Sequence, residues 1–82
     1  MDNKITIEYC DPCNYKKPAT RLAEDIKDQF GEQITRVILL PTQSIGNFEV
    51  SLGRELIFSK KNSGNFPRPG EIGQLLIMRL LK

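Results

Sequence analysis

Residues 4–13 read KITIEYCDPC, a short alternating stretch that runs directly into a Cys-x-x-Cys motif. Its isoleucines and tyrosine occupy alternate positions, and the residues between them are polar or charged. This alternation predicts a β-strand over residues 4–9 with one buried face. The motif, from Cys10 to Cys13, is therefore expected at the end of the first strand, where the chain turns.

An amphipathic helix is expected after the motif. Pro18 suits the first turn of a helix, where its missing N–H would have had no partner. From Ala19 to Phe30, apolar residues recur at spacings of three and four, and Gly31 is a typical stop. The pattern predicts a helix over about residues 17–30.

Three further strands are expected. One strand is expected to begin at Ile34 and to continue through the apolar run of residues 37–40, which is typical of a strand covered on both faces, and Pro41 is expected to end it. Residues 48–52 alternate between apolar and polar side chains, and a Gly-Arg pair then offers a two-residue turn to residues 55–59. These two strands are therefore predicted to form a hairpin.

The chain is expected to close with a loop and a helix. Residues 60–70 are rich in turn formers and basic side chains, which is typical of a surface loop. Apolar residues on much of the circumference predict a helix from Glu71 to about Leu81 that packs on the sheet. The order β-α-β-β-β-α predicts an α/β (α+β) fold, a small sheet packed with two helices, in a single domain of residues 1–82.

Charge and composition exclude several function classes. The 12 Lys and Arg residues are scattered among 10 Asp and Glu residues, for a formal charge of +2, so no nucleic acid partner is expected. The chain has no histidine, and no paired-carboxylate motif or phosphate-binding glycine loop is present. Hydrolase and nucleotide chemistry are therefore not expected.

The termini and the apolar runs bear on location and assembly. The chain starts without the apolar stretch of a signal peptide, and no apolar run approaches the roughly 20 residues that span a bilayer. We therefore expect a cytoplasmic protein with no membrane contact. A domain this small needs its apolar surface for its own core, so we expect a monomer, with a weak homodimer through the last helix as the alternative.

The Cys-x-x-Cys motif favours dithiol redox chemistry. Cys10 and Cys13 are spaced so that their sulfurs can form a short disulfide that opens and closes. A helix N-terminus beside the motif would favour a thiolate, as would the charge of Lys16, whereas Asp11 would oppose it. Pro12 stiffens the intervening pair and limits how far the two sulfurs can separate.

Three other interpretations of the cysteines stay open at this point. Two Cys residues at this spacing form half of a tetrahedral zinc site, and Asp, Glu or a second subunit would have to supply the rest. A structural disulfide would constrain little of the unfolded chain and would be reduced in the cytosol. The pair could also belong to an interaction module that senses redox state without turnover.

Four further motifs accompany the cysteines and make the pattern specific. They are Tyr15-Lys16-Lys17-Pro18, Gly46-x-Phe48-Glu49-Val50, Leu56-Ile57-Phe58-Ser59-Lys60-Lys61 and Gly64-Asn65-Phe66-Pro67. Together with Cys10-x-x-Cys13 they make the chain resemble, over nearly its whole length, the selenoprotein W-like Rdx family, the group that also includes selenoproteins T and H. The resemblance implies a thioredoxin-like fold and a redox function.

The resemblance also implies an order of attack within the pair. Selenium-containing members of the family carry selenocysteine at the second motif position, which is Cys13 in this chain. By this analogy Cys13 forms a mixed disulfide with glutathione or a protein thiol, and Cys10 resolves it, whereas an ordinary thioredoxin uses the opposite order. Glutathione is then a possible co-substrate, and no metal or bound cofactor is expected.

Two residues outside the motif are further site candidates. Thioredoxins place a cis-proline opposite the dithiol, and the corresponding stretch here contains Gly46 instead. Gly46 could let the backbone approach a bound thiol substrate closely, or it could serve only a turn with an unusual φ. Phe66 could belong to a partner-docking surface beside the dithiol, or it could cap the core.

The basic residues Lys60, Lys61 and Arg68 could attract the carboxylates of glutathione or an acidic partner, or form a solvated rim.

Overall fold

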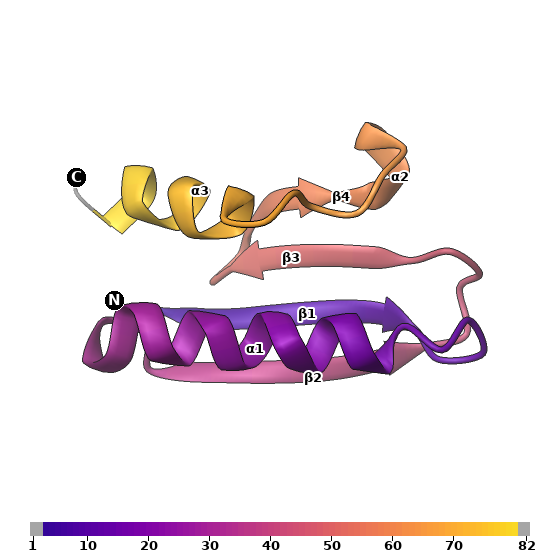
Figure 1. Cartoon of the computed structure of the whole chain (residues 1–82), viewed down its shortest axis with the longest axis horizontal. Coiled ribbons are helices and arrows are strands. Elements are labelled where there is room, and N and C mark those ends of the chain that lie inside the picture. The colour runs from indigo at the N-terminus through magenta and orange to yellow at the C-terminus, as the bar shows by residue number, and fades with distance from the viewer. Residues whose placement is uncertain (1–2, 81–82) are drawn as a thin grey trace.

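The computed structural model describes residues 3–80, which form a four-stranded sheet with helices packed on it (Figure 1). In chain order the elements are β1 (Lys4–Cys10), α1 (Lys16–Phe30), a 3₁₀ turn (Gly31–Gln33), β2 (Arg36–Thr42), β3 (Phe48–Leu52), β4 (Glu55–Ser59), α2 (Lys60–Ser63) and α3 (Glu71–Leu80). The predicted order β-α-β-β-β-α is confirmed, with the short helix α2 added between β4 and α3. The end of the last helix, predicted at about Leu81, lies outside the described residues.

The strand that carries the cysteine motif is central in the sheet. The strand order is β2-β1-β3-β4, with β1 parallel to β2 and antiparallel to β3. Ile7 pairs with Leu39 on one side and with Val50 on the other. Because β1 is hydrogen-bonded on both sides, its end at Cys10 is held in a fixed position.

One face of the sheet forms the core with the helices. Alternate residues of β1 are fully buried, as the sequence pattern predicts, and the residues between them are partly exposed. The buried set consists of Ile5, Ile7, Tyr9, Ala19, Ala23, Ile26, Phe30, Ile34, Phe48, Val50, Ile57, Phe58, Ile72 and Leu76. The sheet and the helices therefore share one continuous core, as expected for a domain of this size.

The first helix matches the prediction at both ends. Apolar residues spaced three and four apart, from Ala19 to Phe30, make up its buried face. Gly31 ends it with φ of +53°, and its N–H donates to the carbonyl of Lys27. A positive φ at this position is what makes glycine a common helix stop.

The prediction for the second strand is wrong in two respects. β2 lies at the edge of the sheet, so its apolar residues are half-buried, and Leu40 is exposed rather than covered on both faces. The strand also continues through Pro41 to Thr42. Proline lacks an N–H to donate, and an edge strand tolerates it because one row of its backbone groups has no partner strand.

The predicted surface loop over residues 60–70 begins with the one-turn helix α2. Ser59 caps this helix by accepting a hydrogen bond from the N–H of Asn62 at 3.3 Å. Gly64 ends it with φ of +81°, and its N–H donates to the carbonyl of Lys60 at 2.7 Å. A single turn has no apolar periodicity, so only its capping residues indicate it in the sequence.

The last helix packs on the core through one face only. Ile72, Gly73 and Leu76 are buried, whereas Ile77 and Met78 are exposed. The predicted packing of this helix is therefore confirmed for part of its apolar surface. Across residues 3–80, the helices are all too short or too polar to traverse a lipid bilayer.

Candidate redox site

The end of β1 fixes the backbone of the first cysteine. The N–H of Cys10 donates to the carbonyl of Asn47 at 2.8 Å, and the N–H of Asp11 donates to the carbonyl of Thr42 at 2.9 Å. The last residue of β2 and the residue that precedes β3 thus both hold the start of the motif. Cys10 itself has no exposed surface.

A tight turn then brings the second cysteine back towards the first. Asn14 adopts a φ of +62°, which asparagine tolerates better than most residues. The N–H of Tyr15 donates to the carbonyl of Cys10 at 3.4 Å and closes the turn. Cys10 and Cys13 form a disulfide with their Cα atoms 5.3 Å apart. The pair can therefore exist in two oxidation states, joined or as two thiols.

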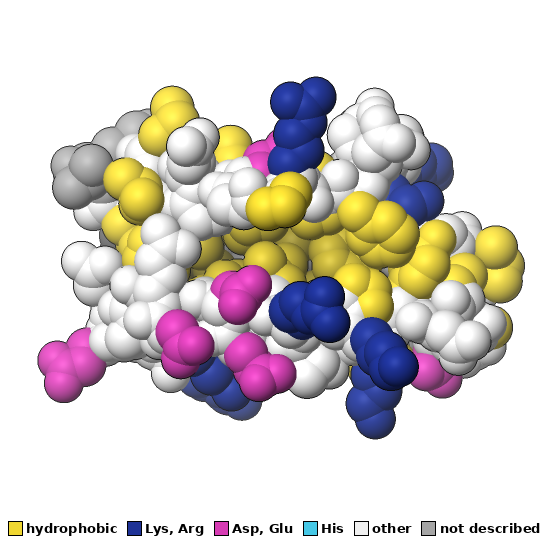
Figure 2. All heavy atoms as spheres, in the orientation of Figure 1, with side chains coloured by type: hydrophobic (Ala, Val, Ile, Leu, Met, Phe, Trp, Pro, Cys, Tyr) yellow, Lys and Arg dark blue, Asp and Glu magenta, His cyan; other side chains and the backbone are white. Residues whose placement is uncertain are grey.

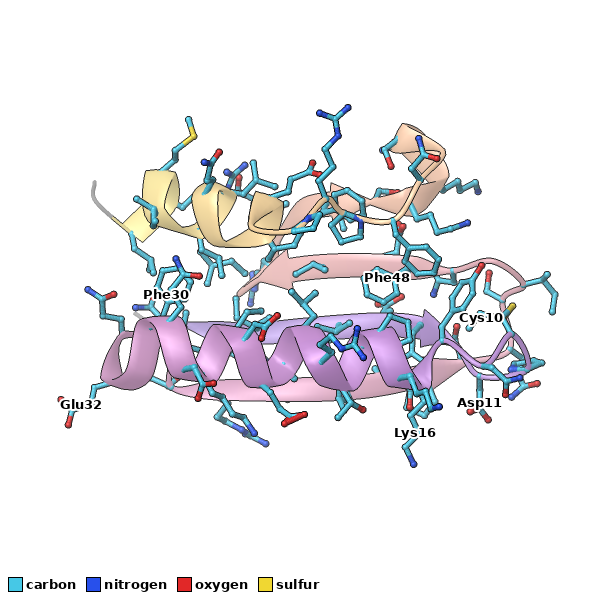
Figure 3. The ribbon with its side chains drawn as sticks, in the orientation of Figure 1. Cys10, Asp11, Lys16, Phe30, Glu32 and Phe48 are labelled. Carbon is cyan, nitrogen blue, oxygen red and sulfur yellow. A yellow bond between two sulfur atoms is a disulfide. The ribbon has the colours of Figure 1, made fainter. Side chains whose placement is uncertain are left out.

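The two sulfur-bearing residues differ in their access to solvent. Cys10 is completely buried beneath the turn, whereas Cys13 is partly exposed and follows the exposed Pro12. Figure 3 places Cys10 at the end of the sheet where α1 begins. An external thiol or disulfide can therefore approach the residue Cys13 and has no path to Cys10 in this conformation.

Gly46 contacts the second cysteine directly. Its N–H donates to the Sγ of Cys13 at 3.3 Å, and its φ is +80°. The loop that carries Gly46 is held by Asn47, whose amide Nδ2 donates to the Oγ1 of Thr42 at 3.1 Å. No cis peptide bond occurs within residues 3–80. Gly46 lies just before β3 and beside the motif, the stretch in which thioredoxins carry their cis-proline. The unusual φ expected for this glycine is present, and its backbone N–H contacts Cys13. A close approach of Gly46 to a bound thiol substrate stays a prediction.

The backbone angle of Gly46 leads to a stability prediction. A Cβ built at this position meets no atom within 4 Å, so a side chain fits and only the positive φ opposes it. Gly46→Val is expected to lower the free energy of unfolding by about 1–2 kcal/mol, because a β-branched residue is strained at this angle. Gly46→Asn should lose clearly less, since asparagine tolerates the left-handed region. Urea unfolding of the disulfide form measures both, and an equal loss in the two variants would contradict the assignment of the cost to φ.

The first turn of α1 lies immediately after the motif. Tyr15 is the N-cap and makes no side-chain capping hydrogen bond, and the first turn holds no acidic residue. The helix N-terminus therefore keeps its partial positive charge next to Cys13. Lys16 is exposed, and Figure 3 shows its side chain directed away from Cys10 into solvent. Its predicted influence on a thiolate is therefore restricted to long-range charge.

An aromatic cluster lies beside the motif. The ring of Tyr15 lies 4.7 Å from that of Phe66 and 6.5 Å from that of Phe48, and Phe48 and Phe66 are 5.1 Å apart, all edge to face. The ammonium of Lys60 lies 5.6 Å from the Tyr15 ring and 5.3 Å from the Phe66 ring. Phe66 thus packs on the core through Phe48 and keeps 38% of its surface exposed. The sequence indicates Phe66 and Lys60 separately, but nothing in it indicates that they meet at Tyr15.

Residues 3–80 offer no further ligands for a zinc ion beside the two cysteines. Within residues 3–80, no three or more His, Cys, Asp or Glu side chains gather where they could hold a metal ion. In this conformation the described residues would therefore supply two zinc ligands, the reduced Cys10 and Cys13.

The fold and the site together define a class: a thioredoxin-like domain with a Cys-x-x-Cys disulfide between its first strand and first helix. The model of the Rdx family matches residues 4–77, which is most of the chain. The chain therefore belongs to the Rdx family.

Solved structures share the fold of this chain. The selenoprotein W-related protein of Vibrio cholerae is 28% identical, with a TM-score of 0.91, and the match covers 98% of this chain and 99% of that one. A protein of Bordetella parapertussis shares the fold, with a TM-score of 0.88 at 24% identity, over 93% of this chain and 95% of its own. The predicted thioredoxin-like fold is thus confirmed.

Curated relatives match over a shorter region. Migration and invasion enhancer 1 of Bos taurus is 34% identical over 65 residues, which are 78% of this chain and 53% of that protein. The protein of the same name from Mus musculus is 33% identical over 64 residues, or 77% of this chain and 52% of that protein. The chain spans about half the length of these curated relatives.

Proposed function

We propose that this chain is a thiol–disulfide redox protein in which Cys13 exchanges with glutathione or a protein thiol and Cys10 resolves the product. The observation that carries this proposal is the contrast between the buried Cys10 and the partly exposed Cys13. Membership of the Rdx family and a disulfide within the motif support the redox class of chemistry.

The proposed reaction starts from the dithiol form. The Cys13 thiolate attacks one sulfur of a substrate disulfide, which forms a mixed disulfide on Cys13 and releases the other substrate sulfur as a thiol after it takes up a proton. The Cys10 thiol then loses its proton and its sulfur attacks the Sγ of Cys13. This second step releases the remaining substrate thiol and forms the Cys10–Cys13 disulfide. The substrate gains two electrons and two protons, and the protein loses them.

Two features support Cys13 as the attacking residue. The N–H of Gly46, which donates to the Sγ of Cys13, would also stabilise negative charge on that sulfur. The partial positive charge at the start of α1 acts in the same direction. Cys10 is buried and close in space to Cys13, which suits a thiol that acts only after a mixed disulfide has formed.

An oxidation experiment tests the redox class against the zinc interpretation. Titration of the reduced protein with glutathione disulfide is expected to convert it completely to the intramolecular disulfide, seen in the intact mass as the loss of two hydrogen atoms. Metal content is measured on the same reduced sample. A stoichiometric amount of zinc in a protein that resists oxidation would rule out the proposal.

A turnover assay distinguishes a redox catalyst from a sensor. Substoichiometric protein is expected to accelerate the reduction of hydroxyethyl disulfide by glutathione, because each cycle regenerates the dithiol. A protein that oxidises once and leaves this rate unchanged would instead be a redox-sensing module.

A further inference from the structure

A groove with an apolar floor and two basic side chains crosses the helical side of the molecule. It has a volume of about 360 Å³ and lies between α1 and the segment that leads into α3. Phe48 and Ile72, both almost fully buried, contribute to it, and Phe66 and the prolines Pro67 and Pro69 line it as well. Figure 2 shows the groove as a band of hydrophobic side chains that crosses the middle of this face.

The dimensions of the groove suit a short stretch of polypeptide. Along α1 its lining runs from Pro18 to Ile26, a span of about 12 Å at the helical rise of 1.5 Å per residue. An extended chain advances about 3.3 Å per residue, so roughly four residues would fill this length. The proline-rich wall offers few backbone N–H donors, so side chains rather than strand pairing would give the recognition.

Two arginines line the groove. Arg21 lines it from α1 and Arg68 from the facing segment, and both are exposed. Neither guanidinium has a hydrogen bond or an ion pair with another described residue, whereas Arg79 pairs with Glu55 at 2.8 Å. Dark-blue basic side chains flank the hydrophobic band on both sides in Figure 2. Asp25 is the acidic residue of the lining and follows Arg21 by one helical turn.

We infer that this groove binds a short segment of a partner protein in which apolar side chains stand next to carboxylates. The apolar side chains would contact Phe66 and the two prolines above the buried floor. The carboxylates would pair with Arg21 and Arg68, whose planar guanidinium groups suit bidentate contacts with carboxylates. Burial of apolar surface would supply most of the affinity, and the arginines would select acidic over basic segments.

A binding experiment with defined peptides tests the inference. The probe is a short fluorescein-labelled peptide without cysteine, in which leucine alternates with glutamate, and fluorescence anisotropy on the disulfide form measures its affinity. One comparison peptide replaces glutamate with lysine, and another replaces leucine with serine. We expect each to bind at least about tenfold more weakly than the probe.

Charge reversal in the groove supplies the decisive comparison. The double variant Arg21→Glu/Arg68→Glu is expected to lose about tenfold in affinity for the acidic probe and to gain affinity for the lysine peptide. The control Arg36→Glu/Arg54→Glu changes the net charge equally at exposed positions outside the groove and should bind like the original chain. An equal loss in both double variants, or a preference of the original chain for the lysine peptide, would overturn the inference.

Other occupants would be visible in the same variants. In one such outcome the chain fails to bind the peptides and binds phosphatidylserine vesicles, with the binding lost in the Arg21→Glu/Arg68→Glu variant. That result would overturn the inference and identify a lipid surface as the ligand of the groove. Sedimentation equilibrium could show a dimer of the original chain that the Arg21→Glu/Arg68→Glu variant does not form. That result would overturn the inference and identify a second copy of this chain as the occupant of the groove. Because the probe carries no sulfur and the cysteines stay joined, failure here would leave the proposed redox function standing.

Discussion

Cys13→Ser is expected to slow thiol–disulfide exchange with glutathione disulfide by at least about 100-fold, because it removes the partly exposed cysteine of the motif and leaves only the buried Cys10. Cys10→Ser should behave differently. Its Cys13 can still attack the substrate, but no second thiol follows, so the reaction stops at a mixed disulfide. Both variants are expected to keep the fold, because serine is close to cysteine in size. Cys10→Ser should cost more stability than Cys13→Ser, since it buries a hydroxyl at a position with no exposed surface.

The two variants form a matched pair that fixes the order of attack. Intact mass spectrometry after exposure to glutathione disulfide should show one glutathione added to the Cys10→Ser protein, and peptide mapping should place it on Cys13. The Cys13→Ser protein should stay largely unmodified under the same conditions. A glutathione adduct that accumulates instead on Cys10 of the Cys13→Ser protein would establish the order used by thioredoxin and overturn the proposed one.

Much of this fold is readable in local patterns. The alternation in β1 and the three-and-four spacing in α1 each reflect a single buried face. The residues that are buried in the structure are therefore the apolar residues of these two sequence patterns. Gly31 was readable as a helix stop for the same reason, since the backbone angle that ends the helix favours one residue type. These features depend on neighbours in sequence.

The errors occur where a neighbour in space decides the outcome. The apolar run of β2 indicates burial on both faces, but no local signal says that β2 has a partner on one side only. The same edge position allows Pro41 to stay within the strand. Hydropathy reports how apolar a strand is, and the strand order of the sheet decides how much of it is covered.

The candidate site divides in the same way. The motif of Cys10 and Cys13 and its place after β1 follow from the sequence, whereas the contrast in their exposure depends on how the turn sits against the sheet. The N–H of Gly46 reaches the Sγ of Cys13 across 33 positions of sequence. No spacing rule reports a contact of that kind, and it arises because β1 and β3 are adjacent in the sheet.

The largest effect on stability is expected from Phe48→Ala, which should lower the free energy of unfolding by about 3–5 kcal/mol. Phe48 is 1% exposed, begins β3 and belongs to the aromatic cluster with Tyr15 and Phe66. A chain of this length has a total stability of roughly 4–12 kcal/mol, so the variant would retain only a small part of it or unfold. The loss combines the buried area of the ring with the cavity left behind.

Phe66→Ala is the matched control, because it removes the same side chain from the same cluster at a position that is 38% exposed. It should cost about 1–2 kcal/mol, since part of its ring is already in contact with water. Urea unfolding of the disulfide forms, followed by far-ultraviolet circular dichroism, measures both losses. Similar losses in the two variants would mean that Phe66 belongs to the core as fully as Phe48 does. A small loss for Phe66→Ala and a large one for Phe48→Ala would show that Phe66 contributes little to the stability of the core. Substitution of Phe66 could then change peptide binding in the groove without unfolding the chain.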